Sequence, residues 1–346
     1  MELTESIGNH AASAGPGAVD SATIRRKRSF TILSARLLPI LALVVVLCIL
    51  WTYAPHFYRL NNLVNILLQA AVLGVLAIGM TFVMVSGGID LSLPSAMAFG
   101  AVLGGLVMDG KPGLVPLGLL IMMSVPVAIG AFNGFAIAYL RMLPFVVTLA
   151  TMTVVGGATV WITNSRTVEG FPEVFIDTLN HRPAGIPIAV LALAVLASLA
   201  SVFTSRTRYG RWVYALGISE KAARVARVPA KPVLLSTYVI AGLLGGVAAI
   251  LLTGRLGSAS ANMGADVIVL DIVSSCVVGG VSIYGGKGHP LGAVGGAIFI
   301  TLISNILNAL GVSFYVTLIA KGIVIILFIA LDNIVRAATN AARTAR

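Results

Sequence analysis

The sequence predicts an all-α polytopic membrane protein with about ten transmembrane helices. Of its 346 residues, 58% are hydrophobic and only 10% are charged, and the mean hydropathy is +1.01. A soluble domain carries roughly 25% charged residues, so this chain cannot hide its apolar surface in a soluble core. Apolar runs of the length that spans a bilayer, about 20 residues, recur along the chain. The basic residues also gather on one side of these runs.

Ten apolar runs are the candidate spans. The third is short and continues the chain after a Gly-Gly break, and a short Gly-rich turn separates the eighth from the ninth. We expect a transmembrane domain over 35–335. The spans are 37–54, 62–86, 95–108, 114–139, 145–164, 186–204, 233–253, 267–284, 290–310 and 315–334.

The two ends of the chain are polar. Residues 1–34 are rich in Gly, Ala and Ser and carry a basic cluster, Arg25-Arg26-Lys27-Arg28, so we predict a disordered cytoplasmic tail. The tail is too long for the charged part of a signal peptide, and no Ala-x-Ala-type cleavage site follows. The run 37–54 is therefore predicted to be a retained helix, and 336–346 a cytoplasmic C-terminal tail.

The positions of the basic residues predict the orientation. Ten spans put both termini on one side. If that side is the cytoplasm, 17 of the 23 Lys and Arg residues lie in inside segments and 5 lie outside. This is the positive-inside pattern of membrane proteins. The net charge of +11 thus encodes orientation, with some attraction to lipid headgroups, and does not indicate nucleic-acid binding.

The second span ends in an unusual break. The run reaches Ser86, breaks at Gly87-Gly88, presents Asp90 and restarts at Pro94. A broken helix frees backbone polar groups that must line a cavity or pack against protein, which is typical of membrane transport proteins. We therefore predict a re-entrant region here. Asp90 either lies near a translocation path or caps the helix that contains Pro94, and the two roles are compatible.

Three Gly-rich strings lie in the third, seventh and ninth spans, at 100–105, 242–246 and 292–296. Small residues four apart let helix backbones approach closely in lipid, so helix packing is the simplest explanation. Five helices followed by five are also compatible with an inverted repeat.

The sequence lacks the motifs of an enzyme. The stretch 105–112 matches a nucleotide-binding P-loop until its last position, where Pro112 replaces the required Ser or Thr. The four histidines are scattered without metal-ligand spacing, and Cys48 and Cys276 lie in apolar runs. We expect no catalytic residues, no metal and no cofactor on this chain.

The inside segment 210–231 predicts a short surface helix. Gly217 ends one element, Ser219 can cap the next, and Glu220 to Arg227 are good helix formers before Pro229. Glu220 favours the N-terminal end of such a helix and Arg224 its C-terminal end. A helix this short needs a partner to hold it. The alternative is an exposed basic loop that only sets topology.

Several segments of the chain together resemble the permease subunits of bacterial ATP-binding-cassette (ABC) importers of the ribose/xylose/galactose type. The matching pieces occur in family order over about 250 residues. One departure is Leu93-Pro94, where the family usually has Val-Gly. The pieces are GMTFVMVSGGIDLS (79–92), GRWVYALGISEKAAR (210–224), GRLGSA (254–259), VVGGVSIYGGKG (277–288) and VTLIAKGIVIILFIALD (316–332).

The resemblance implies a function and a set of partners. It implies the inner-membrane subunit of an ATP-driven importer for a pentose, hexose or related polyol, paired with a second permease copy or a paralogue. A cytoplasmic ABC ATPase would bind ATP and Mg, and a periplasmic protein would bind the sugar. The inside helix would be the coupling helix that docks on the ATPase, with Gly217, Glu220, Ala222, Ala223 and Arg224.

Two sets of residues are candidates for the translocation path: those of the break, and uncharged polar residues within the spans, since a sugar path needs groups that hold hydroxyls weakly. Hydrogen bonds between helices are the commoner use of such residues. The candidates are Gly87, Gly88, Asp90 and Ser92 at the break and Asn133, Thr148, Thr151, Asn305 and Asn308 in the spans.

Two other functions remain open. An ion-coupled transporter that works alone would need protonatable or sodium-binding groups near the midplane, and the chain has few of them. The same ABC machinery could instead carry a nucleoside or a furanose-like signal molecule.

Asp271 and Lys321 are charged residues inside predicted spans. They lie five and seven residues into the eighth and tenth spans, about 6–10 Å below the outer boundary at 1.5 Å per residue. Because an isolated charge in hydrocarbon is costly, opposite charges at matched depth should pair. The alternative is that Lys321 snorkels outward and Asp271 caps its own helix.

Overall fold

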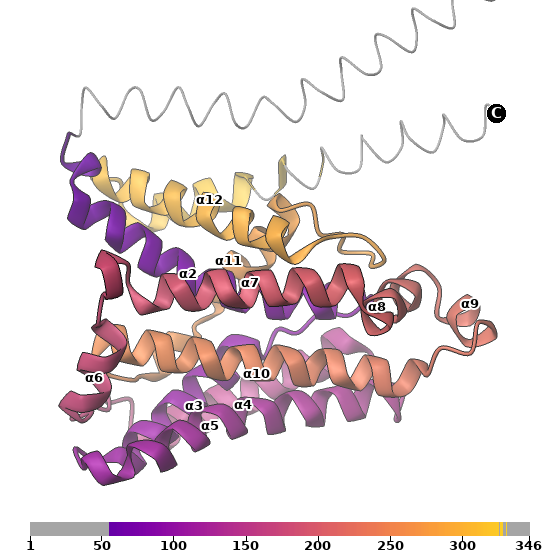
Figure 1. The fold of residues 1–346 in the computed structure, drawn as a ribbon, viewed down its shortest axis with the longest axis horizontal. Coiled ribbons are helices and arrows are strands. Elements are labelled where there is room, and N and C mark those ends of the chain that lie inside the picture. The colour runs from indigo at the N-terminus through magenta and orange to yellow at the C-terminus, as the bar shows by residue number, and fades with distance from the viewer. Residues whose placement is uncertain (1–54, 325, 328–329, 331–346) are drawn as a thin grey trace, which may run out of the picture. The chain divides into compact units, whose positions relative to one another are not determined.

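The computed structural model describes residues 55–324, 326–327 and 330, and these are almost entirely helical (Figure 1). The described residues form no β-strand, and one isolated bridge joins Val168 to Ala259. The prediction of an all-α membrane fold is confirmed at this level. The run 37–54 and the tails 1–34 and 336–346 lie outside the described residues.

Seven of the described helices are long and apolar enough to cross a membrane, and two more apolar helices are shorter. The seven are α2 (Leu60–Val85), α4 (Val115–Ala138), α5 (Pro144–Thr163), α7 (Ile188–Arg206), α10 (Ala230–Leu256), α11 (Asp266–Val278) with the 3-10 turn η4 (Ala261–Gly264), and α12 (Pro290–Ala309). The two shorter ones are α3 (Leu93–Met108) and a helix over Phe314–Val324. The remaining helical elements are η1 (Pro55–Tyr58), η2 (Pro112–Leu114), α6 (Glu173–Asn180), η3 (Pro183–Gly185), α8 (Arg208–Ile218) and α9 (Glu220–Val225).

Apolar length located most of these helices. Six predicted runs begin and end within two residues of α2, α3, α4, α5, α7 and α12. The eighth run, predicted over 267–284, is wrong at its end, because α11 stops at Val278. Gly280 then takes a positive φ of 81°, a left-handed backbone that a helix cannot continue through.

Helices α2 and α10 form the centre of the bundle. They are the most enclosed of the long helices. Helix α10 packs along α4, α2 and α3, while α12 packs against α2 and α11. Tyr238 of α10 is completely buried, in one core with Leu76, Met80 and Met97.

The Gly-rich strings let these helices approach one another. A Cβ at Gly242 of α10 would lie 2.3 Å from the carbonyl oxygen of Pro126 in α4. The equivalent distances are 2.9 Å from Gly104 of α3 to the Gly118 oxygen, and 1.9 Å from Gly296 of α12 to the Ser275 oxygen. No side chain fits at such distances, so the predicted use of these strings in helix packing is confirmed.

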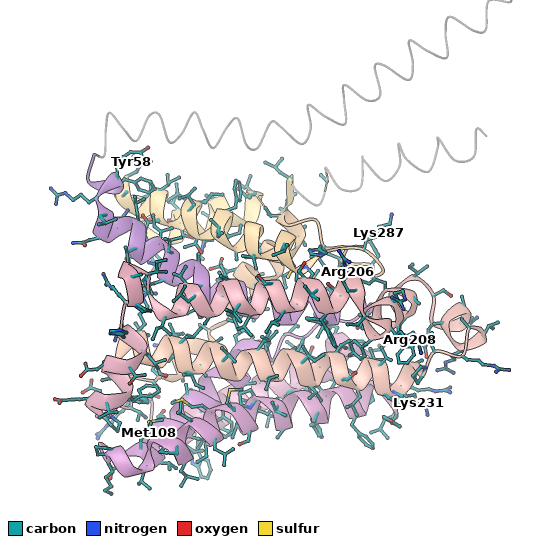
Figure 2. All side chains as sticks on the ribbon, in the orientation of Figure 1. Tyr58, Met108, Arg206, Arg208, Lys231 and Lys287 are labelled. Carbon is teal, nitrogen blue, oxygen red and sulfur yellow. The ribbon has the colours of Figure 1, made fainter. Side chains whose placement is uncertain are left out.

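The two ends of the bundle differ. Helices α8 and α9 lie at one end and α6 at the other (Figure 1). Figure 2 shows Arg206, Arg208, Lys231 and Lys287 at the α9 end, and Tyr58 and Met108 at the opposite end. The segment 165–185, which lies between two predicted spans, contains α6 and buries Phe171 and Phe175.

Candidate functional site

The connection between α2 and α3 is pressed against α10. Helix α2 ends at Val85, and Gly87 takes a positive φ of 89°. The Gly88 N–H still donates to the Val83 oxygen at 3.0 Å. A Cβ at Gly88 would lie 2.4 Å from the Tyr238 hydroxyl. Glycine is therefore required at position 87 by the backbone conformation and at position 88 by the contact with α10.

Asp90 is buried within this connection, with 2% of its surface exposed. One oxygen of its carboxylate accepts from the Ser92 N–H at 3.0 Å and from the Ser92 hydroxyl at 2.7 Å. The N-cap residue of α3 is Ser92, so the predicted cap at Asp90 is displaced by two residues. Asp90 nevertheless satisfies the backbone N–H at the start of α3.

A chain of hydrogen bonds leads from Asp90 into two neighbouring helices. The Asn133 amide of α4 donates to the Ser92 hydroxyl at 2.8 Å, and the Thr151 hydroxyl of α5 donates to the Asn133 oxygen at 2.7 Å. The Thr148 hydroxyl donates to the Pro144 oxygen at 2.9 Å, with the Ile89 oxygen at 3.4 Å. All of these polar side chains are buried. Buried and mutually paired groups hold a break in place, and this arrangement favours a bracing role.

The predicted path residues of α12 are not part of this chain. The Asn305 side-chain oxygen accepts from the Asn62 amide of α2 at 3.1 Å. Asn62 lies near the start of α2, whereas the break follows the other end of that helix. Asn308 is exposed. The structure therefore separates Asn305 and Asn308 from the residues of the break.

The predicted surface helix after Ser219 is present as α9. The Ser219 hydroxyl accepts from the Ala222 N–H at 3.3 Å, and Glu220 and Arg224 form an ion pair along the helix. The helix ends at Val225, two residues before the predicted Arg227. Arg227 takes a positive φ of 59°, which ends the helical backbone. The local capping signals thus fixed the start of α9 better than its end.

The two alanines of α9 point in different directions. Ala223 is 2% exposed and packs inward, while Ala222 is exposed. Ala223 therefore packs within this chain, and of the two alanines only Ala222 is exposed to a partner. The outward apolar residues are Val225, 86% exposed, and Ile218, 73% exposed. Sequence reasoning missed them, although apolar residues within so polar a segment were the available signal.

The tip of α8 joins α9 to the α2–α3 break. A Cβ at Gly217 would lie only 1.8 Å from the Val85 oxygen, and the Gly286 N–H donates to that same oxygen at 2.8 Å. The Tyr214 hydroxyl of α8 donates to the Gly288 oxygen at 2.6 Å. Burial raises the pKa of the Tyr214 phenol above its ordinary value, so it remains a neutral donor. Three segments far apart in sequence thus meet through backbone atoms.

A cavity of about 610 Å³ opens beside this junction. It brings together residues that the sequence predicted for two separate roles. Its lining includes two residues of the break, Gly87 and Gly88, and two basic residues, Arg141 and Lys231. It also includes three residues of the predicted coupling helix, Gly217, Glu220 and Arg224. The Lys231 ammonium also lies 5.3 Å from the ring centre of Tyr139, within range of a cation–π interaction.

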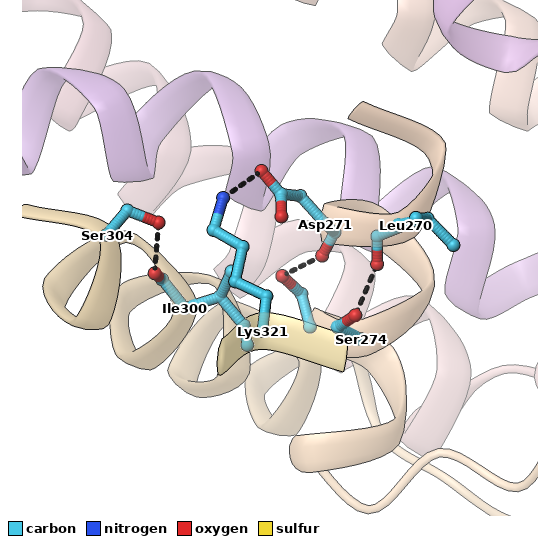
Figure 3. A network of polar contacts seen from close by, with 7 residues as sticks. Leu270, Asp271, Ser274, Ile300, Ser304 and Lys321 are labelled. Atoms are coloured by element: carbon cyan, nitrogen blue, oxygen red, sulfur yellow. Dashed lines mark hydrogen bonds and ion pairs between the residues drawn. The ribbon is translucent and has the colours of Figure 1, made fainter. Parts of the chain in front are cut away.

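Asp271 and Lys321 form an ion pair. The Lys321 ammonium lies 2.9 Å from a carboxylate oxygen of Asp271 (Figure 3). The Lys321 side chain is 13% exposed and the Asp271 side chain is 20% exposed. They join α11 to the helix Phe314–Val324. Lys321 is thus turned toward Asp271, and snorkelling is not needed to stabilise its charge.

No group of three or more His, Cys, Asp or Glu residues within the described part of the chain could hold a metal ion. Cys276 is buried in α11, and its thiol lies 3.8 Å from the Thr81 hydroxyl. Cys48 lies outside the described residues.

Comparison with known proteins identifies the family of this chain. Residues 62–330 match the family described as "Branched-chain amino acid transport system / permease component". The chain belongs to this family. Ribose import permease protein RbsC of Escherichia coli K12 is 36% identical over 299 residues, which are 85% of this chain and 92% of that protein. No solved structure matches the chain.

Other relatives carry other names. D-allose transport system permease protein AlsC of Escherichia coli K12 is 32% identical over 85% of this chain and 90% of its own length. Galactose/methyl galactoside import permease protein MglC of Haemophilus influenzae is 30% identical over 90% of this chain and 97% of its own length. Family membership and the apolar helices make this chain a multi-pass inner-membrane permease component, and such components are transporter subunits and not enzymes.

Proposed function

We propose that this chain is the transmembrane subunit of an ATP-driven ABC importer for a ribose-like pentose, a hexose or a related polyol. The relatives named for ribose, allose and galactose support a sugar, since they are 30–36% identical to this chain over most of its length. Because these relatives are named for different sugars, family membership alone does not identify which sugar this chain transports.

ATP and Mg would be bound by a separate cytoplasmic ATPase, which docks on α9. The observation that carries this proposal is the geometry around α9. Its exposed Val225 and Ile218 offer apolar contacts to a partner, and Gly217 beside it touches the end of α2. Docking at α9 would therefore act on the α2–α3 break through one backbone contact.

The membrane topology follows from the same proposal. Seven long helices, two shorter apolar ones and the run 37–54 would make ten crossings, with 87–92 as a re-entrant region. The basic α9 end would be cytoplasmic, together with both termini. A second permease subunit, identical or paralogous, would complete the path, and a periplasmic binding protein would deliver the sugar at the α6 end.

Reconstitution tests the proposal. The purified chain is placed in liposomes with a sugar gradient and an ion gradient, alone and then with its ATPase and binding protein. We expect concentrative uptake only in the complete, ATP-supplied system. Concentrative uptake by the chain alone would overturn the proposal and favour an ion-coupled transporter.

A second candidate cargo is a branched-chain amino acid, because the matching family is described by that transport activity. The complete system separates the two candidates. Labelled D-ribose, D-galactose, D-allose and L-leucine are each offered at equal concentration. We expect uptake of a sugar and none of leucine.

A further inference from the structure

A second cavity, of about 250 Å³, lies among α2, α10, α11, α12 and the helix Phe314–Val324. It is closer to the α6 end, because Arg255 is in the last turn of α10 and Gln69 is ten residues into α2. Its lining combines an apolar wall with six polar side chains. These are Gln69, Arg255, Asp271, Thr301, Ser304 and Lys321.

The charged groups of this cavity already have partners. Asp271 and Lys321 are paired at 2.9 Å, and the Arg255 guanidinium donates to the Asn65 side-chain oxygen at 2.6 Å (Figure 3 shows the first pair). A metal cation would meet two positive charges here, and an inorganic anion would meet the Asp271 carboxylate. Lys321 neutralises Asp271, and Arg255, held by the neutral Asn65 amide, leaves one excess positive charge. That charge disfavours a cation and the carboxylate disfavours an anion, whereas a neutral ligand meets neither repulsion.

The neutral groups, in contrast, have hydrogen-bonding capacity to spare. Thr301 is 5% exposed, yet its hydroxyl bonds to none of the described residues. The other buried threonines of the described chain each form a hydrogen bond, most often to the carbonyl of the preceding helical turn, as in Thr81 and Thr253. The Gln69 amide likewise has no partner among the described residues. Ser304 donates to the Ile300 oxygen at 2.9 Å and keeps its acceptor sites free.

We propose that this cavity is a binding subsite for a neutral polyhydroxylated molecule of monosaccharide size. The proposal rests on the proposed function and deepens it, by assigning to the transported sugar a resting place before the α2–α3 break. Each hydroxyl of such a ligand both donates and accepts, which matches Thr301, Gln69 and Ser304. The volume lies below the roughly 300–1,000 Å³ of sites for drug-sized ligands, so the occupant must be small.

The partnered charges also suit a transport subsite. The free oxygen positions of Asp271 and the remaining N–H groups of Arg255 can each contact a hydroxyl without leaving their present partners. The ligand therefore breaks no ion pair on entry and leaves none unpaired on exit. A zwitterionic amino acid would instead need a free carboxylate for its ammonium group, and the Asp271 carboxylate is already paired with Lys321.

Equilibrium binding tests the subsite. The full chain is purified in lipid nanodiscs, and binding of labelled D-ribose, D-galactose and D-allose is measured, with L-leucine and sodium phosphate as competitors. We expect weak binding of at least one sugar, about tenfold weaker in Thr301→Val and in Gln69→Leu. The matched control is Thr159→Val, because Thr159 is buried but donates to the Val155 oxygen of its own helix. Its sugar affinity should equal that of the parent.

A second measurement reports where the sugar binds. Ser304→Cys is labelled with a small thiol reagent, and we expect the bound sugar to slow labelling severalfold. Equal sugar affinity in all three variants together with no protection would overturn the subsite. Displacement by leucine or phosphate, with the same dependence on Thr301, would overturn its assignment to a sugar.

Uptake by the complete importer distinguishes this inference from the function on which it rests. If the parent complex takes up sugar and Thr301→Val and Gln69→Leu do so with unchanged KM, the function stands and the subsite fails. If the parent complex takes up no sugar, the proposed function itself fails.

Discussion

The contact between Gly217 and Val85 provides the sharpest test of how α9 is tied to the α2–α3 break. Replacing Gly217 with alanine puts a Cβ 1.8 Å from the Val85 oxygen, whereas an ordinary contact begins at 3.4 Å. The tip of α8 and the end of α2 must therefore separate by about 1.6 Å. Both atoms belong to backbone or lie next to it, so no side-chain rotation can relieve the overlap.

The cost follows from three effects. Overpacking in a close contact costs about 1–3 kcal/mol, and loss of the Gly286–Val85 hydrogen bond costs about 0.5–1.5 kcal/mol. The better helix propensity of alanine returns up to about 1 kcal/mol. We expect a net destabilisation of about 0.5–4.5 kcal/mol, with ATP-driven uptake lowered further because α9 is displaced from the break.

The assay compares Gly217→Ala with Gly295→Ala. A Cβ at Gly295 of α12 meets no atom within 4 Å, so this control should be as stable as the parent or slightly more so. Unfolding is measured by titrating sodium dodecyl sulfate into mixed micelles, and uptake in liposomes with the ATPase and binding protein. Coincident unfolding curves for the two variants, with uptake at the parent level, would refute the contact.

Three further outcomes follow from named contacts. Asp271→Asn and Lys321→Met should each lower the amount of folded protein, because removal of one partner leaves a charge that is largely buried. The double variant should recover part of the loss, and additive losses would show that the residues are independent. Ala223→Glu should destabilise the chain, because position 223 is buried, whereas Ala222→Glu should leave unfolding unchanged and weaken ATPase association in a pull-down. Thr151→Val should destabilise the chain by about 1–3 kcal/mol, since it removes the hydroxyl that donates to the buried Asn133 oxygen at 2.7 Å. An unchanged unfolding midpoint would contradict the bracing role of that hydrogen-bond chain.

Local patterns in the sequence predicted the helices well. Apolar length is a property of contiguous residues, so the bounds of α2, α4 and α5 follow from it directly. Ser219 was recognised as a cap because capping involves only the next few residues. The helix α6 was missed because it depends on contacts with distant segments, such as that of Phe175 with the core. The end of α11 was placed too late because Gly279-Gly280 was not taken as a helix end.

The candidate site was predicted in part, for the same reason. The sequence identified Asp90, Ser92 and Asn133 as unusual polar groups, but not that they bond to one another. The sequence indicated Gly217 but not its contact with Val85. It also did not show that Ala222 points outward and Ala223 inward. Gln69 and Thr301 drew no attention, because an amide or hydroxyl in an apolar helix becomes informative only when the structure shows whether it has a partner.

The two cavities lie toward opposite ends of the bundle, and α2 links them. Gln69 and Leu76 of α2 line the smaller cavity, and Val85 at the end of the same helix receives the contacts from Gly217 and Gly286. A shift of α8 against the Val85 oxygen would therefore bear on a helix whose other half forms a wall of the proposed sugar subsite. Because α2 is the most enclosed long helix of the described chain, it cannot bend freely, and a displacement at one end must be taken up by its neighbours along its length. The break that follows Val85 is tied to α3 and α4 by the hydrogen bonds among Asp90, Ser92 and Asn133, so a displacement of this end of α2 would also reach those two helices.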